Sequence, residues 1–145
     1  MLDTCAYIDI LQGTALQVVE DLLNVRISNH SSICLAELTH LFGRLDPGHP
    51  KTPSTLRELR DVIGHDIPAH RLTKPSTRVL GEAGMLAGLT MRLSGHAKDQ
   101  VLLNDAILYL HAQERGYVVL TRNLADFDFF HQLMPSGRIL FYRKV

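Results

Sequence analysis

The sequence has 145 residues, of which 46 % are hydrophobic and 21 % charged, and its 15 basic side chains balance its 15 acidic ones. This size and composition are typical of one globular domain, which we expect to span residues 1–145. No apolar run is long enough to cross a bilayer, the first residues do not resemble a signal peptide, and two cysteines are too few for a disulfide framework. We therefore expect a cytoplasmic protein that does not enter a membrane.

The predicted elements alternate between short apolar strands and helices. In chain order, we expect a short strand over 1–3, helices over 5–12 and 14–24, a strand over 30–33, helices over 34–45 and from residue 54, a weak strand over 67–72, helices over 75–93 and 99–115, a strand over 117–121, a helix over 127–133 and a last strand over 138–142. Residues 46–53, dense in proline and glycine, are expected to form a loop between helices. Strands separated by helices predict an α/β fold, a three-layer α/β/α sandwich with a mainly parallel sheet.

The charge is unevenly distributed along the chain. Residues 1–43 hold five acids and one base, whereas residues 44–98 hold nine bases and five acids. An acidic first third beside a basic middle suits a protein that collects cations at one place and meets a polyanion at another. Random scatter over a solvated surface explains the same distribution about equally well.

Two acids follow predicted strands, at the edge where parallel sheets bind their ligands. Asp3 comes directly after the first strand, and Asp126 lies five residues past the strand over 117–121. Each also has a structural interpretation, Asp3 as the N-cap of a helix and Asp126 as a turn residue before one. Asp128 is a rival for the role of Asp126.

Asp105 lies on the apolar side of the clearest helix. On a helical wheel the polar stripe consists of Gln100, Asn104, His111 and Arg115, whereas the neighbours of Asp105 are Val101, Leu102, Tyr109 and Ala112. A carboxylate among apolar side chains is costly unless a cation or hydrogen bonds compensate it. The alternative is a carboxylate at the margin of the core that bonds to nearby backbone.

Glu37 completes the set, although an ion pair with Arg44 would explain it without any function. Together, the four acids are more persuasive than any one of them. Carboxylates that converge repel one another unless a cation lies among them, and oxygen-rich sites suit hard cations such as Mg²⁺ or Mn²⁺.

Four segments resemble the successive blocks of PIN domains, and the VapC-type toxins of bacterial toxin–antitoxin pairs above all. The segments are Leu2-Asp3-Thr4-Cys5, Ser31 to Leu38, Asn104 to Leu108, and Val119 to Phe127. Their order and spacing fit the family along essentially the whole chain, whereas residues 46–98 match only in general character. The strand before Asp3 departs from the family pattern, because it has two residues where family members usually have several.

The resemblance implies an α/β/α sandwich that cleaves RNA, often structured RNA such as tRNA, with Mg²⁺ or Mn²⁺. It assigns Asp3, Glu37, Asp105 and Asp126 as the catalytic and metal-binding acids, with Thr121 and Asn123 as accessory polar groups. It also implies an antitoxin partner and a homodimer. Five basic residues of the middle third would then hold the RNA backbone: Arg57, Arg60, Arg71, Lys74 and Arg78. For Arg57 and Arg60, a solvated helix face is a slightly better explanation.

Other chemistries find less support in the sequence. Neither the histidines nor the cysteines fall at zinc-binding spacings, and Cys5 and Cys34 are better explained as buried small side chains than as a redox pair. A phosphatase with an aspartyl nucleophile usually carries a second Asp two residues after the first, where this chain has Cys5. A non-catalytic PIN-like module that binds RNA or protein remains the main alternative.

Overall fold

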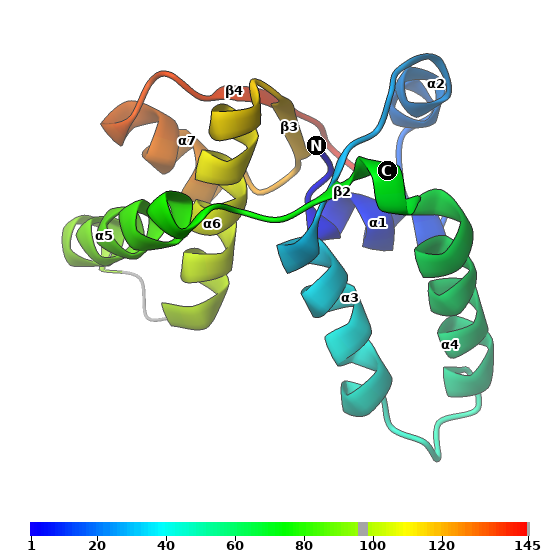
Figure 1. Cartoon of the computed structure of the whole chain (residues 1–145). Helices are drawn as coiled ribbons and strands as arrows, with labels where there is room; N and C mark the ends of the chain where they lie inside the picture. Colours follow the sequence, from blue (N-terminus) through cyan, green and yellow to red (C-terminus); the bar gives the residue numbers. More distant parts are fainter. Residues whose placement is uncertain (96–98, 145) are drawn as a thin grey trace.

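The computed structural model describes residues 1–95 and 99–144, which form a mixed α/β arrangement of helices around short parallel strands (Figure 1). The helices are α1 (Thr4–Leu11), α2 (Gln17–Val25), α3 (Ser32–Arg44), α4 (Thr52–Asp61), α5 (Thr77–Ser94), α6 (Asp99–Arg115) and α7 (Leu124–Leu133). The strands are β1 (His30–Ser31), β2 (Leu72–Thr73), β3 (Val118–Thr121) and β4 (Arg138–Phe141).

The start of the chain joins two pairs of parallel strands. β1 pairs with β2 in the register His30↔Leu72, and β3 pairs with β4 in the register Val118↔Arg138. Between the pairs, the Leu2 amide donates to the Asn29 carbonyl at 3.2 Å, and Leu2 forms a parallel bridge with Leu120. The expected parallel pairing is confirmed, and the carboxyl ends of the strands meet at one edge.

Helices α5 and α7 and strand β3 pack against helix α6 in one half of the molecule (Figure 1). Leu102, Ala106 and Leu108 of α6 are buried. The ring of Tyr109 lies against those of Phe127 and Phe130, both of them fully buried. This core fixes α6 relative to β3 and thereby positions Asp105 beside the strand ends.

The tight packing around Tyr109 explains the glycine at position 137. A Cβ atom at Gly137 would lie 2.4 Å from the Tyr109 ring, which no real side chain tolerates. Gly116, with φ of +68°, follows the last residue of α6, where glycine adopts the left-handed conformation without strain.

Three local expectations were wrong. The strand expected over 67–72 shrinks to β2. A π-turn (η1, Val62–Asp66) precedes this segment, and a 3-10 turn (η2, Ala69–Arg71) occupies its middle. Pro68 lacks an amide donor and precedes the 3-10 turn, which explains the shortening. Helix α7 begins three residues early, at Leu124, because the Asn123 side chain caps it.

The third error concerns His111, which was expected in the polar stripe of α6. It is fully buried, and its Nδ1 and Nε2 atoms lie 3.1 Å from Ser31 Oγ and 3.2 Å from Thr73 Oγ1. Burial lowers the pKa of His111, so the ring is neutral at pH 7 and ties α6 to β1 and β2. None of the helices in the described part of the chain combines the length and hydropathy required to span a membrane.

Candidate functional site

Asp3 follows the N-terminal bridge to β3 and is almost fully buried, with 5 % of its surface exposed. It occupies the N-cap position of α1, but its side chain makes no capping hydrogen bond. Its Oδ2 atom instead accepts hydrogen bonds from the Thr121 hydroxyl and from Cys5 Sγ, the latter at 2.9 Å. The interpretation of Asp3 as a simple cap is therefore wrong, and its carboxylate is oriented toward the end of β3.

Cys5 is half-buried rather than buried, and its thiol has a defined role as a donor to Asp3. Burial, together with the charge of Asp3, raises the pKa of Cys5 to about 12. The thiol is therefore protonated at neutral pH, in keeping with its role as a hydrogen-bond donor to Asp3. Cys34 is buried, as expected, and its Sγ lies 3.4 Å from the Leu2 carbonyl oxygen.

Glu37 lies on α3 and faces α1 and α6. Thr4 Oγ1 donates to its Oε2 atom, and Asn104 Nδ2 donates to its Oε1 atom at 2.7 Å. The alternative of an ion pair with Arg44 is not observed among the described residues. Both Glu37 oxygens are thus held by neutral donors, one of them from the residue directly before Asp105.

Asp105 is buried on α6, as its wheel position predicted, although its expected apolar neighbour Val101 is 52 % exposed. Asn123 Nδ2 donates to its Oδ2 atom at 2.9 Å. Burial, followed by the charges of Asp3, Glu37 and Asp126, raises the pKa of Asp105 to about 8. The shift shows that the four predicted acids lie within electrostatic reach of one another.

Asp126 lies in the first turn of α7, where a second hydrogen of the Asn123 amide donates to its Oδ2 atom at 2.8 Å. Its backbone amide donates in turn to Asn123 Oδ1 at 3.3 Å. The rival Asp128 is exposed on the same helix and accepts a hydrogen bond from Gln132. The structure therefore brings Asp126, and not Asp128, beside Asp105.

These four acids, the acidic cluster, are held by hydroxyl, thiol and amide donors. Among the described residues, no basic side chain forms an ion pair with Asp3, Glu37 or Asp105. Carboxylate oxygens with uncompensated charge match the preference of hard divalent cations. Within residues 1–95 and 99–144, however, no three His, Cys, Asp or Glu side chains are close enough to share one ion; His96 lies outside these ranges.

The donor set therefore fits an ion held by one or two carboxylates and completed by water, the usual mode of Mg²⁺ binding in proteins. The residues that orient these carboxylates are Thr121 and Asn123, which the sequence had indicated, and Thr4, Cys5 and Asn104, which it had not. Asn104 could have been found from its position next to Asp105. Thr4 and Cys5 belong to the same block as Asp3.

A further buried carboxylate, Asp9 on α1, went unnoticed in the sequence. It is fully buried, forms an ion pair with Arg122 Nε at 2.6 Å and accepts a hydrogen bond from the Tyr142 hydroxyl at 2.8 Å. No local pattern marks Asp9, because both partners come from distant parts of the chain.

The five basic residues proposed to hold RNA are spread over several elements. Arg57 and Arg60 are exposed on α4, and the Arg60 guanidinium lies over the Phe42 ring. Arg71 is half-buried in η2, and Lys74 is exposed after β2. Arg78 forms ion pairs with Glu82 and Glu114, so its charge is already compensated. Among the described residues, no hydrogen bond or ion pair links any of these five side chains to Asp3, Glu37 or Asp105.

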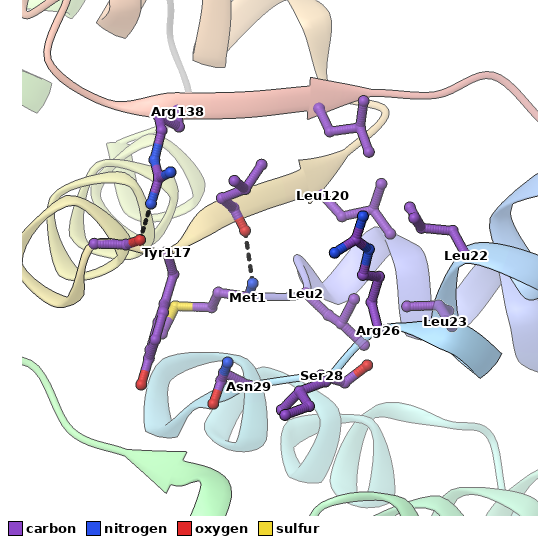
Figure 2. A pocket seen from close by; sticks show the side chains of 14 residues that line it. Met1, Leu2, Leu22, Leu23, Arg26, Ser28, Asn29, Tyr117, Leu120 and Arg138 are labelled. Atoms are coloured by element: carbon purple, nitrogen blue, oxygen red, sulfur yellow. Dashed lines mark hydrogen bonds between the residues drawn. The ribbon is translucent and has the colours of Figure 1, made fainter.

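The hollows of the surface lie away from the acidic cluster. One of about 390 Å³ lies at the amino ends of β3 and β4, where apolar side chains of the first residues, α2 and the strands line it, with Arg26 and Arg138 among them (Figure 2). Another, of about 500 Å³, lies between α2 and the η1 region. None of the four acids lines either of these two hollows.

The fold and the site together define a mixed α/β domain with an acidic cluster beyond the carboxyl ends of parallel strands. No protein-family model matches the sequence, and no curated protein is similar enough in sequence to count as a relative.

Three solved structures are similar over nearly the whole chain. A chain of VapBC2 from Rickettsia felis, bound to a DNA fragment from the promoter, has a TM-score of 0.67 and 18 % identity, with 99 % of this chain and 98 % of that one covered. A chain of DNA-bound VapBC from Salmonella typhimurium has a TM-score of 0.67 and 23 % identity, with 97 % and 96 % covered. A chain of FitAcB from Neisseria gonorrhoeae has a TM-score of 0.68 and 18 % identity, with 97 % and 95 % covered. The chain shares their fold, and the resemblance inferred from its sequence is confirmed at that level.

Proposed function

We propose that this protein is a metal-dependent endoribonuclease with the three-layer architecture of PIN domains, and that it is the toxin of a type II toxin–antitoxin pair. The observation that carries the proposal is the acidic cluster, where burial, followed by the charges of Asp3, Glu37 and Asp126, raises the pKa of Asp105. The fold shared with VapBC and FitAcB chains supports the same function.

Asp3 and Asp105 are the residues that would hold the ion, since they are the most deeply buried acids of the cluster. Bound Mg²⁺ or Mn²⁺ supplies a water of lowered pKa and offsets the charge that develops on a phosphodiester. Thr121 keeps Asp3 in place, and Asn123 holds Asp105 and Asp126 together through one amide group. Glu37, fixed by Thr4 and Asn104, would orient the attacking water.

The substrate would be RNA, with tRNA as one candidate. Arg57, Arg60, Arg71 and Lys74 could contact its backbone as it runs over α4 and β2, whereas Arg78 has its two acidic partners in place. The partners would be a cognate antitoxin and a second copy of this chain, in the cytoplasm. The VapBC complexes support the antitoxin assignment, because each combines two different protein chains.

The test is cleavage of defined RNAs, tRNA among them, by wild-type protein and two Asn variants. We expect cleavage with Mn²⁺, loss of cleavage with EDTA, and recovery when Mn²⁺ is added back. Asp105→Asn should lower the cleavage rate by at least about 100-fold. Loss of a residue that only orients a metal ligand typically costs about 10- to 100-fold, and loss of the ligand itself should cost more. Asp128→Asn, exposed and outside the acidic cluster, is the matched control and should cleave normally.

Other outcomes separate the alternatives. Undiminished cleavage by a folded Asp105→Asn variant would contradict the proposed site. A folded wild-type protein that binds RNA but cleaves none under Mn²⁺ would favour the non-catalytic module. Release of phosphate from a small phosphomonoester, with loss of this activity in Asp3→Asn alone, would favour the aspartyl phosphatase.

A further inference from the structure

A second charged group, built from Asp9, Arg122 and Tyr142, lies beside the acidic cluster and has no part in the chemistry described so far. Asp9 Oδ2 accepts from Arg122 Nε at 2.6 Å and from the Tyr142 hydroxyl at 2.8 Å. The three side chains come from α1, from the residue after β3 and from the residue after β4. They will be called the Asp9–Arg122 group.

The stability of the fold does not require such a group. The Asp9 side chain is 1 % exposed, and a carboxylate so deeply buried loses most of its hydration. Well-packed apolar side chains of similar volume often stabilise a fold as much as a buried ion pair or more. The pair is therefore better explained by what it does to Arg122, which is 39 % exposed, than by its contribution to folding.

The group is directly connected to the acidic cluster. Arg122 follows Thr121, whose hydroxyl donates to Asp3, and the Arg122 backbone amide lies 3.5 Å from Cys5 Sγ. Tyr142 Oη lies 3.8 Å from the same sulfur, which donates to Asp3. The guanidinium is thus anchored at the strand ends, on the flank of the cluster, yet it pairs with Asp9 and not with the four acids.

The geometry of the pair leaves most of the guanidinium available. Asp9 occupies only Nε, and within the described residues no ion pair or hydrogen bond engages the two terminal nitrogens of Arg122. Arg78 is the contrast, since each of its terminal nitrogens faces a glutamate at 3.4 Å. A planar guanidinium with two free amino groups is suited to bidentate contact with a phosphate.

We propose that Arg122 contacts a backbone phosphate of the nucleic acid next to the acidic cluster, and that Asp9 is the positioning residue that holds its guanidinium there. This inference rests on the proposed function for the identity of the substrate as RNA. Asp9 pairs with one nitrogen of the Arg122 guanidinium and leaves the two terminal nitrogens available. Arg122 therefore does not compensate the charge of the acidic cluster, and it does not move freely in solvent.

The experiment measures binding of a single-stranded RNA oligonucleotide in the Asp105→Asn background, in EDTA and at several salt concentrations. Arg122→Gln should weaken binding about 10- to 100-fold, as expected for one charge-assisted contact. The slope of log K against log salt should fall by about 0.7, which corresponds to one phosphate of a single strand. Arg138→Gln is the matched control, because Arg138 bonds to the Gly116 carbonyl at the opposite end of β3 and should leave the slope unchanged.

The positioning role of Asp9 is tested through its effect on RNA binding by Arg122. Asp9→Asn should weaken binding when Arg122 is present and should have no further effect on affinity when Arg122→Gln is already in place. Thermal unfolding of each variant confirms that it is folded. If Asp9→Asn does not fold, Tyr142→Phe replaces it in the test, because this change removes the hydrogen bond from the Tyr142 hydroxyl to Asp9.

Unchanged affinity and salt slope in a folded Arg122→Gln variant would overturn the inference and would reduce the group to a structural tie. The proposed function would survive that result if wild-type protein cleaves RNA with Mn²⁺. Conversely, RNA binding that depends on Arg122 in a protein that never cleaves would support the phosphate contact and contradict the nuclease.

Discussion

Asp105 and Asp9 are two buried aspartates near the same strand ends, and they differ in what surrounds them. Asp9 is fully buried but receives a guanidinium and a phenol hydroxyl. Asp105 is 7 % exposed, and among the described residues its carboxylate accepts a side-chain hydrogen bond from the Asn123 amide alone; burial, followed by the charges of three other carboxylates, raises its pKa to about 8. Burial therefore does not distinguish the two aspartates, whereas a positively charged partner, present for Asp9 and not seen for Asp105 among the described residues, does.

A large loss of stability is expected when the compensated aspartate, Asp9, is changed. Asp9→Asn leaves Arg122 without its counter-charge and should lower the free energy of unfolding by about 2 to 5 kcal/mol, toward the lower end because Arg122 is partly exposed. Urea unfolding at pH 7 measures this change. A loss below 0.5 kcal/mol, roughly that of a surface substitution, would contradict the assignment of Asp9 as a buried, paired charge.

Replacing the other aspartate, Asp105, should instead raise the free energy of unfolding. The folded protein keeps a proton on Asp105 up to about pH 8, whereas the unfolded chain releases it near its ordinary value of 3.8. Because the folded state binds more protons in that window, this group lowers the free energy of unfolding as the pH rises from about 4 to 8. Asn does not titrate, so Asp105→Asn should gain about 5 kcal/mol over wild type across the window in EDTA, or about 1.4 kcal/mol for each pH unit.

Urea unfolding of both proteins from pH 4 to 8 tests this difference, with Asp128→Asn as the exposed control. A stability difference that stays constant with pH would show that the folded protein does not raise the pKa of Asp105.

The smallest effect concerns the amide that joins Asp105 to Asp126. Asn123→Ala removes the N-cap of α7 and should cost about 1 kcal/mol of stability at pH 7. Ser76→Ala, which removes the N-cap of α5, is the matched control with a similar cost. Only Asn123→Ala should also raise the pKa of Asp105 further, because Asn123 is the donor that lowers it. Equal pH profiles for the two variants would contradict the bridging role of Asn123.

The sequence predicted the parts of the molecule that depend on local periodicity. The parallel strands, most helices and the core-side position of Asp105 follow from the spacing of apolar residues along one element. The acidic cluster required the additional rule that parallel strands end at one edge.

What the sequence did not predict depends on partners distant in the chain. His111 belongs to the polar stripe of its helix by position, but it is buried because Ser31 and Thr73 supply hydroxyl partners from β1 and β2. Asp9 resembles an ordinary helical acid until Arg122, 113 residues later, is brought beside it. Helix periodicity contains no information about such contacts.

Calorimetric titration with Mn²⁺ tests the central claim, that the acidic cluster is a cation site, most directly. Wild-type and Asp128→Asn proteins should bind Mn²⁺ at pH 7.5 with the same affinity, and binding should release protons because Asp105 must ionise. Folded Asp105→Asn should bind at least about 100-fold more weakly. Equal Mn²⁺ affinity in wild-type and Asp105→Asn proteins would contradict the account.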